Sequence, residues 1–222
     1  MARFEIFWDD FIFRLDAYMQ AGGEVMWPLA ILSFIMFFLI VERALTIGRG
    51  FVRKPLPFAA AWDYVRRGRD PALDGHHGVV AALVGNFLAA RGDDPELNAR
   101  ILRETAKEMS RALTDRLPFI GALAAVAPLL GLLGTVTGMI ATFDVMAIFG
   151  AGNAKAMAGG ISEALITTQT GLLVAIPGLC MKNFLEKRAK NLEKRLTAAG
   201  LYLTRKLAHE EKIGPQNPSS ET

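Results

Sequence analysis

Residues 159–178 read GGISEALITTQTGLLVAIPG. They overlap an uncharged run of 18 residues, 164–181, and two similar runs precede it: 17 residues at 25–41 and 27 at 117–143. A bilayer core about 30 Å thick needs roughly 17–25 helical residues. Each run is therefore long enough to cross a membrane. The chain is predicted to be an all-α integral membrane protein with three transmembrane helices and large cytoplasmic helical extensions.

Lysine and arginine residues are unevenly distributed around these runs. Residues 43–116 hold 13 of them and residues 182–222 hold 9, whereas the first 24 residues hold two and the connection between the second and third runs holds one. Cytoplasmic loops of membrane proteins carry an excess of basic residues. The long loop and the C-terminal tail are therefore predicted to be cytoplasmic, and the N-terminus periplasmic. The net charge of +3 follows from this sorting and indicates no nucleic-acid partner.

The first 24 residues contain five acidic residues and no continuous apolar core, which is not the pattern of a cleaved signal peptide. Apolar side chains at helical spacing instead predict an amphipathic helix on the membrane surface: Phe4, Phe7, Phe11, Leu15 and Tyr18. The expected segments, in chain order, are this outer-side helix (1–23), the first span (24–45), a cytoplasmic helical loop (46–116), the second span (117–147), a periplasmic loop (148–158), the third span (159–182), a cytoplasmic helix (183–212) and a disordered tail (213–222).

Two cytoplasmic helices are predicted in more detail. One begins at Asp94, a helix-capping residue, and is expected to run straight into the second span. The other carries a narrow apolar stripe, which predicts either a packing seam or a coiled coil. The stripe consists of Leu185, Ala189, Leu192, Leu196, Ala199, Leu203 and Leu207.

Several kinds of chemistry have little support in the sequence. Cys180 is the single cysteine, so an intrachain disulfide and a cysteine-based metal cluster are excluded. The adjacent His76 and His77 fit a solvated loop better than a metal site. No catalytic set or phosphate-binding loop is visible, and Asp144 is interpreted as an interfacial charge, so we expect neither an enzyme nor a bound cofactor.

The second and third uncharged runs share a design. At 100° per residue, small residues cluster around Thr135 in one run and around Thr168 in the other. Such faces suit close helix packing, because small residues let backbones approach, and the residues alone favour that explanation. The alternative is a channel wall whose hydroxyl groups contact water or an ion. The clusters consist of Ala124, Pro128, Gly131, Gly138 and Thr142 around Thr135, and of Ala164, Gly171, Ala175 and Gly178 around Thr168.

Glu163 points to more than packing, because a carboxylate in a transmembrane helix is costly and by default marks a polar pathway. Its position at the end of the run also allows a simple interfacial role. Glu163 lies about 140° around the helix from Thr168, whereas Thr167 and Thr170 share its face. A straight helix cannot direct both faces at one narrow pathway. Either the pore is wide enough to be lined by both faces, or Glu163 bonds to a neighbouring helix, and the sequence does not decide between these alternatives.

At these residues the sequence resembles the MotA/TolQ/ExbB proton-channel family, in its ExbB/TolQ branch. The matching motifs are GLLGTVTGM at 131–139 and GISEALITTQTGLLVAIP at 160–177, together with GGEVMWPLAILSFIMFFLIVERAL at 22–45. The resemblance implies a ring, five subunits in family models, around two copies of an ExbD/TolR-like partner that carries the proton-binding aspartate. It further implies that proton flow drives this partner, which passes work to a periplasmic TonB- or TolA-like protein.

The resemblance assigns residue roles. Thr135 and Thr168 match the family's pore threonines, and Glu163 matches its intramembrane glutamate. The predicted ion pathway comprises Thr135, Thr142, Glu163, Thr167, Thr168 and Thr170, and the predicted close-packing glycines are Gly131, Gly134, Gly138 and Gly171. This chain reads TTQTGL where many members read ATAIGL, so Gln169 and Thr170 add polarity, and the choice between protons and sodium ions stays open.

The expected function is therefore an inner-membrane motor subunit that uses the proton motive force to energise TonB-type transport across an outer membrane. A TolQ-like role in envelope maintenance is the sibling alternative. A purely structural membrane scaffold is the alternative from a different class.

Overall fold

The computed structural model describes residues 2–51, 56–76, 78–92, 94–150 and 153–213. These residues form helices and turns, with no strand among them. Stretches within α2, α5–α6 and α7 are long and apolar enough to cross a membrane. In chain order the elements are α1 (Ala2–Ala21), α2 (Met26–Phe51), α3 (Phe58–Arg67), the 3₁₀ turn η1 (Pro71–Asp74), α4 (Val79–Ala90), α5 (Pro95–Thr114), α6 (Leu117–Phe149) and α7 (Ala154–Ile213).

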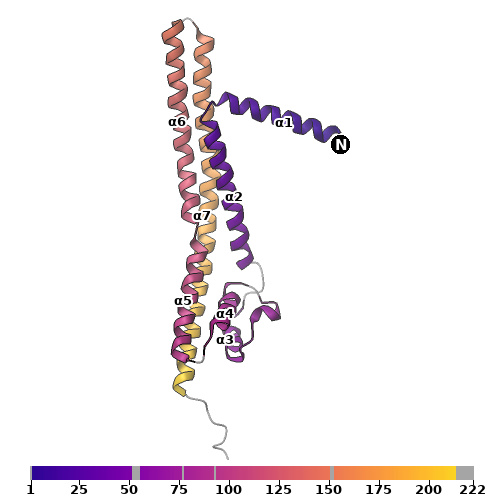
Figure 1. Ribbon diagram of the computed structural model, residues 1–222, viewed down its shortest axis with the longest axis vertical. Coiled ribbons are helices and arrows are strands. Elements are labelled where there is room, and N and C mark those ends of the chain that lie inside the picture. Colours follow the sequence, from indigo (N-terminus) through magenta and orange to yellow (C-terminus); the bar gives the residue numbers. More distant parts are fainter. Residues whose placement is uncertain (1, 52–55, 77, 93, 151–152, 214–222) are drawn as a thin grey trace, which may run out of the picture. The chain divides into compact units, whose positions relative to one another are not determined.

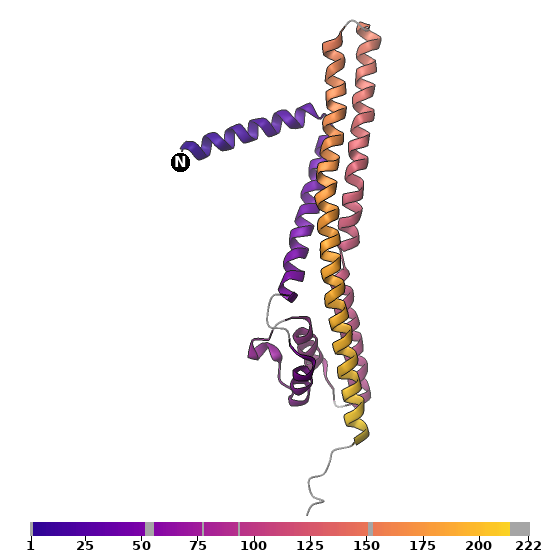
Figure 2. The same cartoon turned by 180° about the vertical axis from the view of Figure 1, so that it is seen from behind.

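The chain divides into two compact units, and the first comprises residues 1–41 and 118–183. In it, α6 and α7 run antiparallel side by side, α2 lies along α7, and α1 projects away from the start of α2 (Figure 1, Figure 2). Large apolar side chains remain exposed on all three long helices, among them Phe34, Phe38, Leu129 and Leu173. An apolar surface of this extent is what lipid or neighbouring spans cover in a membrane protein.

The helix that begins at Asp94 does not run straight into the second span, so this expectation was wrong. α5 ends at Thr114. Its last backbone hydrogen bond is donated by the N–H of Asp115 to the carbonyl of Arg111, 3.0 Å away, and a new helix, α6, begins at Leu117. Pro118 explains the break, because it has no N–H to donate to the carbonyl of Thr114 and its ring would clash with that carbonyl in a continuous helix.

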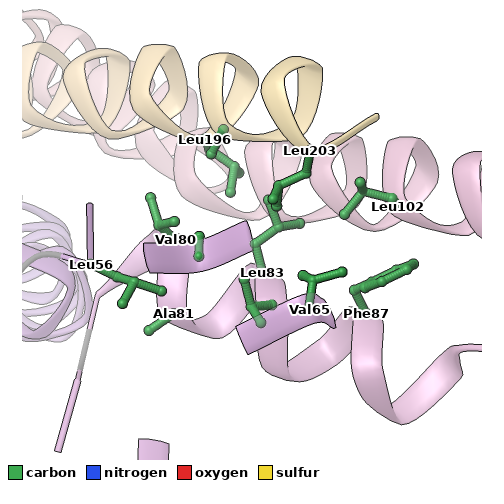
Figure 3. Packing of buried hydrophobic residues seen from close by; sticks show 12 residues of the cluster. Leu56, Val65, Val80, Ala81, Leu83, Phe87, Leu102, Leu196 and Leu203 are labelled. Carbon is green, nitrogen blue, oxygen red and sulfur yellow. The ribbon is translucent and has the colours of Figure 1, made fainter. Parts of the chain in front are cut away.

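The second unit comprises residues 42–117 and 184–222. Its core brings α3, α4 and α5 together against the C-terminal part of α7, with Leu83 and Phe87 of α4 fully buried. Figure 3 shows Leu196 and Leu203 of α7 directed at this cluster. Six of the seven residues in the apolar stripe of α7 are buried and Leu207 is partly buried, so the stripe is a packing seam within this chain. The predicted cap at Asp94 is also confirmed, since its carboxylate accepts from the amide of Glu96 at 3.0 Å.

The antiparallel helices α6 and α7 extend further toward their connection than the sequence indicated. The connection expected at 148–158 is short, because α6 continues to Phe149 and α7 already begins at Ala154. Residues 154–158, which were expected to belong to the loop, lie inside α7, as do Gly159 and Gly160. α7 also continues past residue 182 without a break to Ile213. The side chains of Phe4, Phe7 and Phe11, together with His77 and residues 214–222, lie outside the described part of the chain.

Candidate functional site

The packing of α6 against α7 rests on the smallest residues of both helices, and we call this contact the α6–α7 seam. A Cβ atom built on Gly171 would lie 2.8 Å from the carbonyl oxygen of Ala127, and one on Gly138 would lie 2.7 Å from that of Gly160. A Cβ on Gly131 would lie 3.0 Å from the carbonyl oxygen of Thr167. The two backbones therefore approach more closely than side chains would allow.

Thr142 and Thr167 lie within the α6–α7 seam, where 3% and 1% of their surfaces are exposed. The hydroxyl of Thr142 donates to the carbonyl of Gly138 at 2.9 Å, and that of Thr167 lies 3.0 Å from the carbonyls of both Glu163 and Ala164. Each hydroxyl is thus satisfied by its own helix. This placement differs from the expected ion-path role, because in this chain both side chains are covered by the opposite helix.

Thr135 and Thr168 lie half-buried at one edge of the seam. The hydroxyl of Thr168 lies 3.2 Å from the carbonyl of Gly131 across the seam and 3.1 Å from the carbonyl of Ala164 in its own helix. The hydroxyl of Thr135, one turn from Gly131, donates to the carbonyl of Leu132 at 2.6 Å. Helix geometry places each threonine about 60° from the middle of the seam. Because the helices are antiparallel, both face the same edge.

Glu163 and Thr170 lie at the opposite edge, against α1 and the turn that leads into α2. The Glu163 carboxylate covers Gly23, whose φ of 67° is left-handed, so a side chain at that position would meet both strain and the carboxylate. The Tyr18 hydroxyl lies 2.7 Å from that of Thr170. Thr170 also donates to the carbonyl of Ile166 at 2.7 Å, which makes Tyr18 the donor of the bond between them.

The predicted site residues therefore separate into three groups. Thr142 and Thr167 fill the seam, Thr135 and Thr168 face one edge, and Glu163 and Thr170 face α1 and α2 of the same chain. The contacts of Tyr18, Gly22 and Gly23 with α7 were not predicted. The polar Thr170, at a position where an apolar residue was expected from the resemblance, was the one sign that α7 has a polar partner there.

Three helices of this chain are long and apolar enough to cross a membrane. Two of them pack through a seam of small residues, and hydroxyl groups lie at the edge of that seam. This architecture defines a multi-pass helical membrane protein whose spans carry polar groups without a catalytic constellation among the described residues. The family model described as the MotA/TolQ/ExbB proton channel family matches residues 75–198, more than half of the chain. The chain belongs to this family.

Relatives from both systems of the ExbB/TolQ branch are similar to this chain. An ExbB-like biopolymer transport protein of Synechocystis is 38% identical over 172 residues, covering 73% of this chain and 66% of the relative. Biopolymer transport protein exbB1 of Vibrio cholerae is 28% identical over 93% of this chain and 98% of its own length. The Tol-Pal system protein TolQ of Haemophilus influenzae is 34% identical over 56% of this chain and 58% of the relative.

Proposed function

We propose that this chain is the ring-forming subunit of an inner-membrane, proton-driven motor of the ExbB type. The observation that carries the proposal is the position of Thr135 and Thr168, whose hydroxyl groups share the seam edge that α1 and α2 leave uncovered. In a ring with this edge turned inward, the two threonines of each copy would line a central pore. The pore would hold a dimer of an ExbD/TolR-like partner with one span per copy.

The donor pattern at this edge suggests what the threonines do. Their hydroxyl hydrogens are directed at helix carbonyls, those of Leu132 for Thr135 and of Gly131 and Ala164 for Thr168. The remaining lone pairs of each hydroxyl oxygen can only accept a hydrogen bond. A protonated carboxyl group of the partner can donate to them, whereas a carboxylate cannot. The edge therefore favours the neutral form of the partner's acid as it crosses the apolar part of the pore.

The membrane arrangement that we propose follows the charge distribution. Residues 24–45, 117–147 and 159–182 form the three spans, the N-terminus lies on the periplasmic side, and the basic segments 46–116 and 183–212 are cytoplasmic. α1 then lies at the periplasmic surface of the bilayer. Each proton that crosses the membrane supplies about 2.3 kcal/mol per 100 mV, so several crossings must be coupled to move the partner and a TonB-like transducer.

Two roles within the branch fit this mechanism. The similarity to biopolymer transport protein exbB1 extends over 93% of this chain and that to TolQ of Haemophilus influenzae over 56%, which favours the TonB-type role over the TolQ-like role in envelope maintenance. A structural scaffold is the alternative from another class. It predicts that the edge hydroxyls are dispensable, since close packing is already provided by the glycines of the seam.

The decisive experiment measures energised uptake of a TonB-dependent substrate in cells that lack the native copy, at matched membrane levels of each variant. We expect Thr135→Val and Thr168→Val to reduce uptake at least about tenfold, because valine keeps the shape but removes the acceptor. Thr135→Ser and Thr168→Ser should retain uptake. The matched controls are Thr142→Val and Thr167→Val, whose hydroxyl groups bond only to their own helix.

The same set of variants separates the alternatives. If the edge variants transport normally, the pore role fails and the scaffold is favoured. If the seam variants lose uptake as strongly as the edge variants while remaining in the membrane, the loss reports general helix packing, and the assignment of the pore to this edge is wrong. Rescue of cells that lack TolQ, instead of cells that lack ExbB, would assign the chain to the Tol system.

A further inference from the structure

A groove between α5 and α7 in the second unit has no role in the function proposed above. Its volume is about 370 Å³, and three basic side chains of α5 line it: Arg103, Lys107 and Arg111. They are spaced four residues apart and therefore form a row along one face of the helix. Opposite them, Leu201 of α7 leaves 57% of its surface exposed. The groove thus combines a basic rim with an uncovered apolar wall.

The groove also carries polar groups that would favour an occupant. Its one acidic lining residue, Glu193, already accepts a hydrogen bond from Ser110 at 3.0 Å. The hydroxyl of Thr204, also in the lining, is buried without a hydrogen-bond partner among the described residues. A buried hydroxyl that lacks a partner is unfavourable. The groove therefore suits a segment that brings acidic groups.

α5 also carries a row of two acidic side chains, Glu104 and Glu108, beside its basic row. Glu104 and Glu108 follow Arg103 and Lys107 by one residue each, which places the acidic row about 100° around α5 from the basic row. Both glutamates are exposed. Within the chain, Glu104 makes one ion pair with Lys107 at 3.9 Å, with 75% and 57% of the two side chains exposed. Such an exposed pair is weak and leaves both rows accessible.

We propose that the acidic row of one copy docks on the basic groove of the next copy in the assembly. This proposal rests on the proposed function, in which copies of the chain form a ring. The rotational symmetry of a ring determines which residues of neighbouring copies can meet. In such a ring, equivalent residues of all copies lie at the same height along the ring axis. Where α5 runs nearly parallel to the ring axis, residues one apart in the helix differ in height by about 1.5 Å.

The acidic and basic rows lie at matching heights along α5, so they can meet between neighbouring copies. Glu104 of one copy lies at nearly the height of Arg103 in the next, and Glu108 lies at nearly the height of Lys107. Because the acidic and basic rows occupy different faces of α5, the contact is head-to-tail, which is the type of interface that generates rings. Charge pairs between subunits of this kind set the register of neighbouring copies and exclude wrong arrangements.

The test compares the assembly of full-length variants, extracted in the same mild detergent and measured by native mass spectrometry and by crosslinking in membranes. Lys107→Glu and Glu108→Lys should each weaken assembly about tenfold, because each places like charges opposite one another in every interface. The combined K107E/E108K variant should return to within about twofold of wild type, since the reversed pair is complementary again. Residues 107 and 108 do not face each other on the helix, so a direct pair between them within one chain does not explain this rescue.

The control is Lys206→Glu, an exposed position of α7 outside the groove that carries the same charge change. It should assemble as wild type does. If both single variants also assemble as wild type does, the docking proposal is overturned while the ring stands. K107E could instead keep the ring but no longer co-purify with the ExbD/TolR-like partner. In that case the groove binds this partner, and the proposal of a second copy is overturned. A wild-type chain that is monomeric under all conditions overturns the ring itself.

Discussion

The hydroxyl of Thr168 on α7 lies 3.2 Å from the carbonyl oxygen of Gly131 on α6 and donates to it across the seam. This bond is possible because Gly131 brings its backbone close to α7, where a Cβ would lie 3.2 Å from the Cα of Thr168. The glycines of the seam therefore do more than allow close packing. They place a hydroxyl group of one helix within reach of the backbone of the other, at the edge where we propose the pore.

Replacing Gly134 by alanine should destabilise the first unit. A Cβ at this position would overlap Thr167, with Cγ2 of that residue 2.8 Å away. Thr167 is β-branched and fully buried, so it cannot rotate aside and the helices must separate. We expect a loss of about 1–3 kcal/mol in the free energy of unfolding, measured by denaturant titration in detergent micelles.

The matched control for this prediction is Gly159→Ala. A Cβ at Gly159 meets nothing within 4 Å, and the position lies inside α7, so alanine should leave stability unchanged or raise it. Equal losses in both variants would mean that the seam is not the tight contact described above.

The bond between Tyr18 and Thr170 should stabilise the docking of α1 on α7. A double-mutant cycle with Tyr18→Phe and Thr170→Val should give a coupling free energy of about 0.5–1.5 kcal/mol, because each change removes one partner of a 2.7 Å hydrogen bond. The cycle is read from thermal unfolding in detergent. Tyr18→Phe combined with Thr137→Val provides the control, since the Thr137 hydroxyl donates to Gly134 within α6 at 3.1 Å and the two changes should be additive.

Arg116 occupies the break between α5 and α6 with a φ of 63°, which disfavours every residue with a side chain. Its guanidinium also donates to Glu42, with Nη1 2.7 and 2.8 Å from the two carboxylate oxygens. Arg116→Ala and Arg116→Gly both remove this pair, but glycine adopts the left-handed conformation freely. The glycine variant should therefore be about 1 kcal/mol more stable than the alanine variant in chemical denaturation.

The control for Arg116 is the same pair of substitutions at Arg100, an exposed residue inside α5. There the order should reverse, with alanine about 1 kcal/mol more stable than glycine, because glycine weakens a helix interior. If alanine were more stable than glycine at both positions, the backbone at residue 116 would not be left-handed in solution.

A pH effect is expected at Tyr64 in the second unit. Its hydroxyl donates to the Asp74 carboxylate at 2.8 Å, and this bond raises the pKa of Tyr64 above its ordinary value near 10. A raised pKa means that the contribution to stability is complete below pH about 10 and is lost as the pH rises through the folded-state pKa. Absorbance titration of the tyrosinates should show that Asp74→Asn lowers this pKa. An unchanged titration curve would contradict the contact.

Much of the architecture could be predicted because it depends on local properties of the chain. Uncharged runs of sufficient length predicted three spans, and a capping residue predicted the start of α5 at Asp94. The apolar stripe of α7 was visible from its spacing, although its partner was not. The break at residues 115–116 was not predicted, because helical spacing continues up to it and the apolar run of the second span begins directly after it.

The sequence by itself determined the angles between residues on each helix. The separation of about 140° between Glu163 and Thr168 is a property of helical periodicity, and it assigns the two residues to different faces whatever surrounds the helix. Periodicity has no fixed origin, however. Which face of α7 meets α6, which meets α1 and α2, and which stays open depends on packing partners far away in the chain. Only the tertiary structure decided that Gly134 and Thr167 meet in the seam, that Glu163 turns to Gly23, and that Thr135 and Thr168 share the uncovered edge.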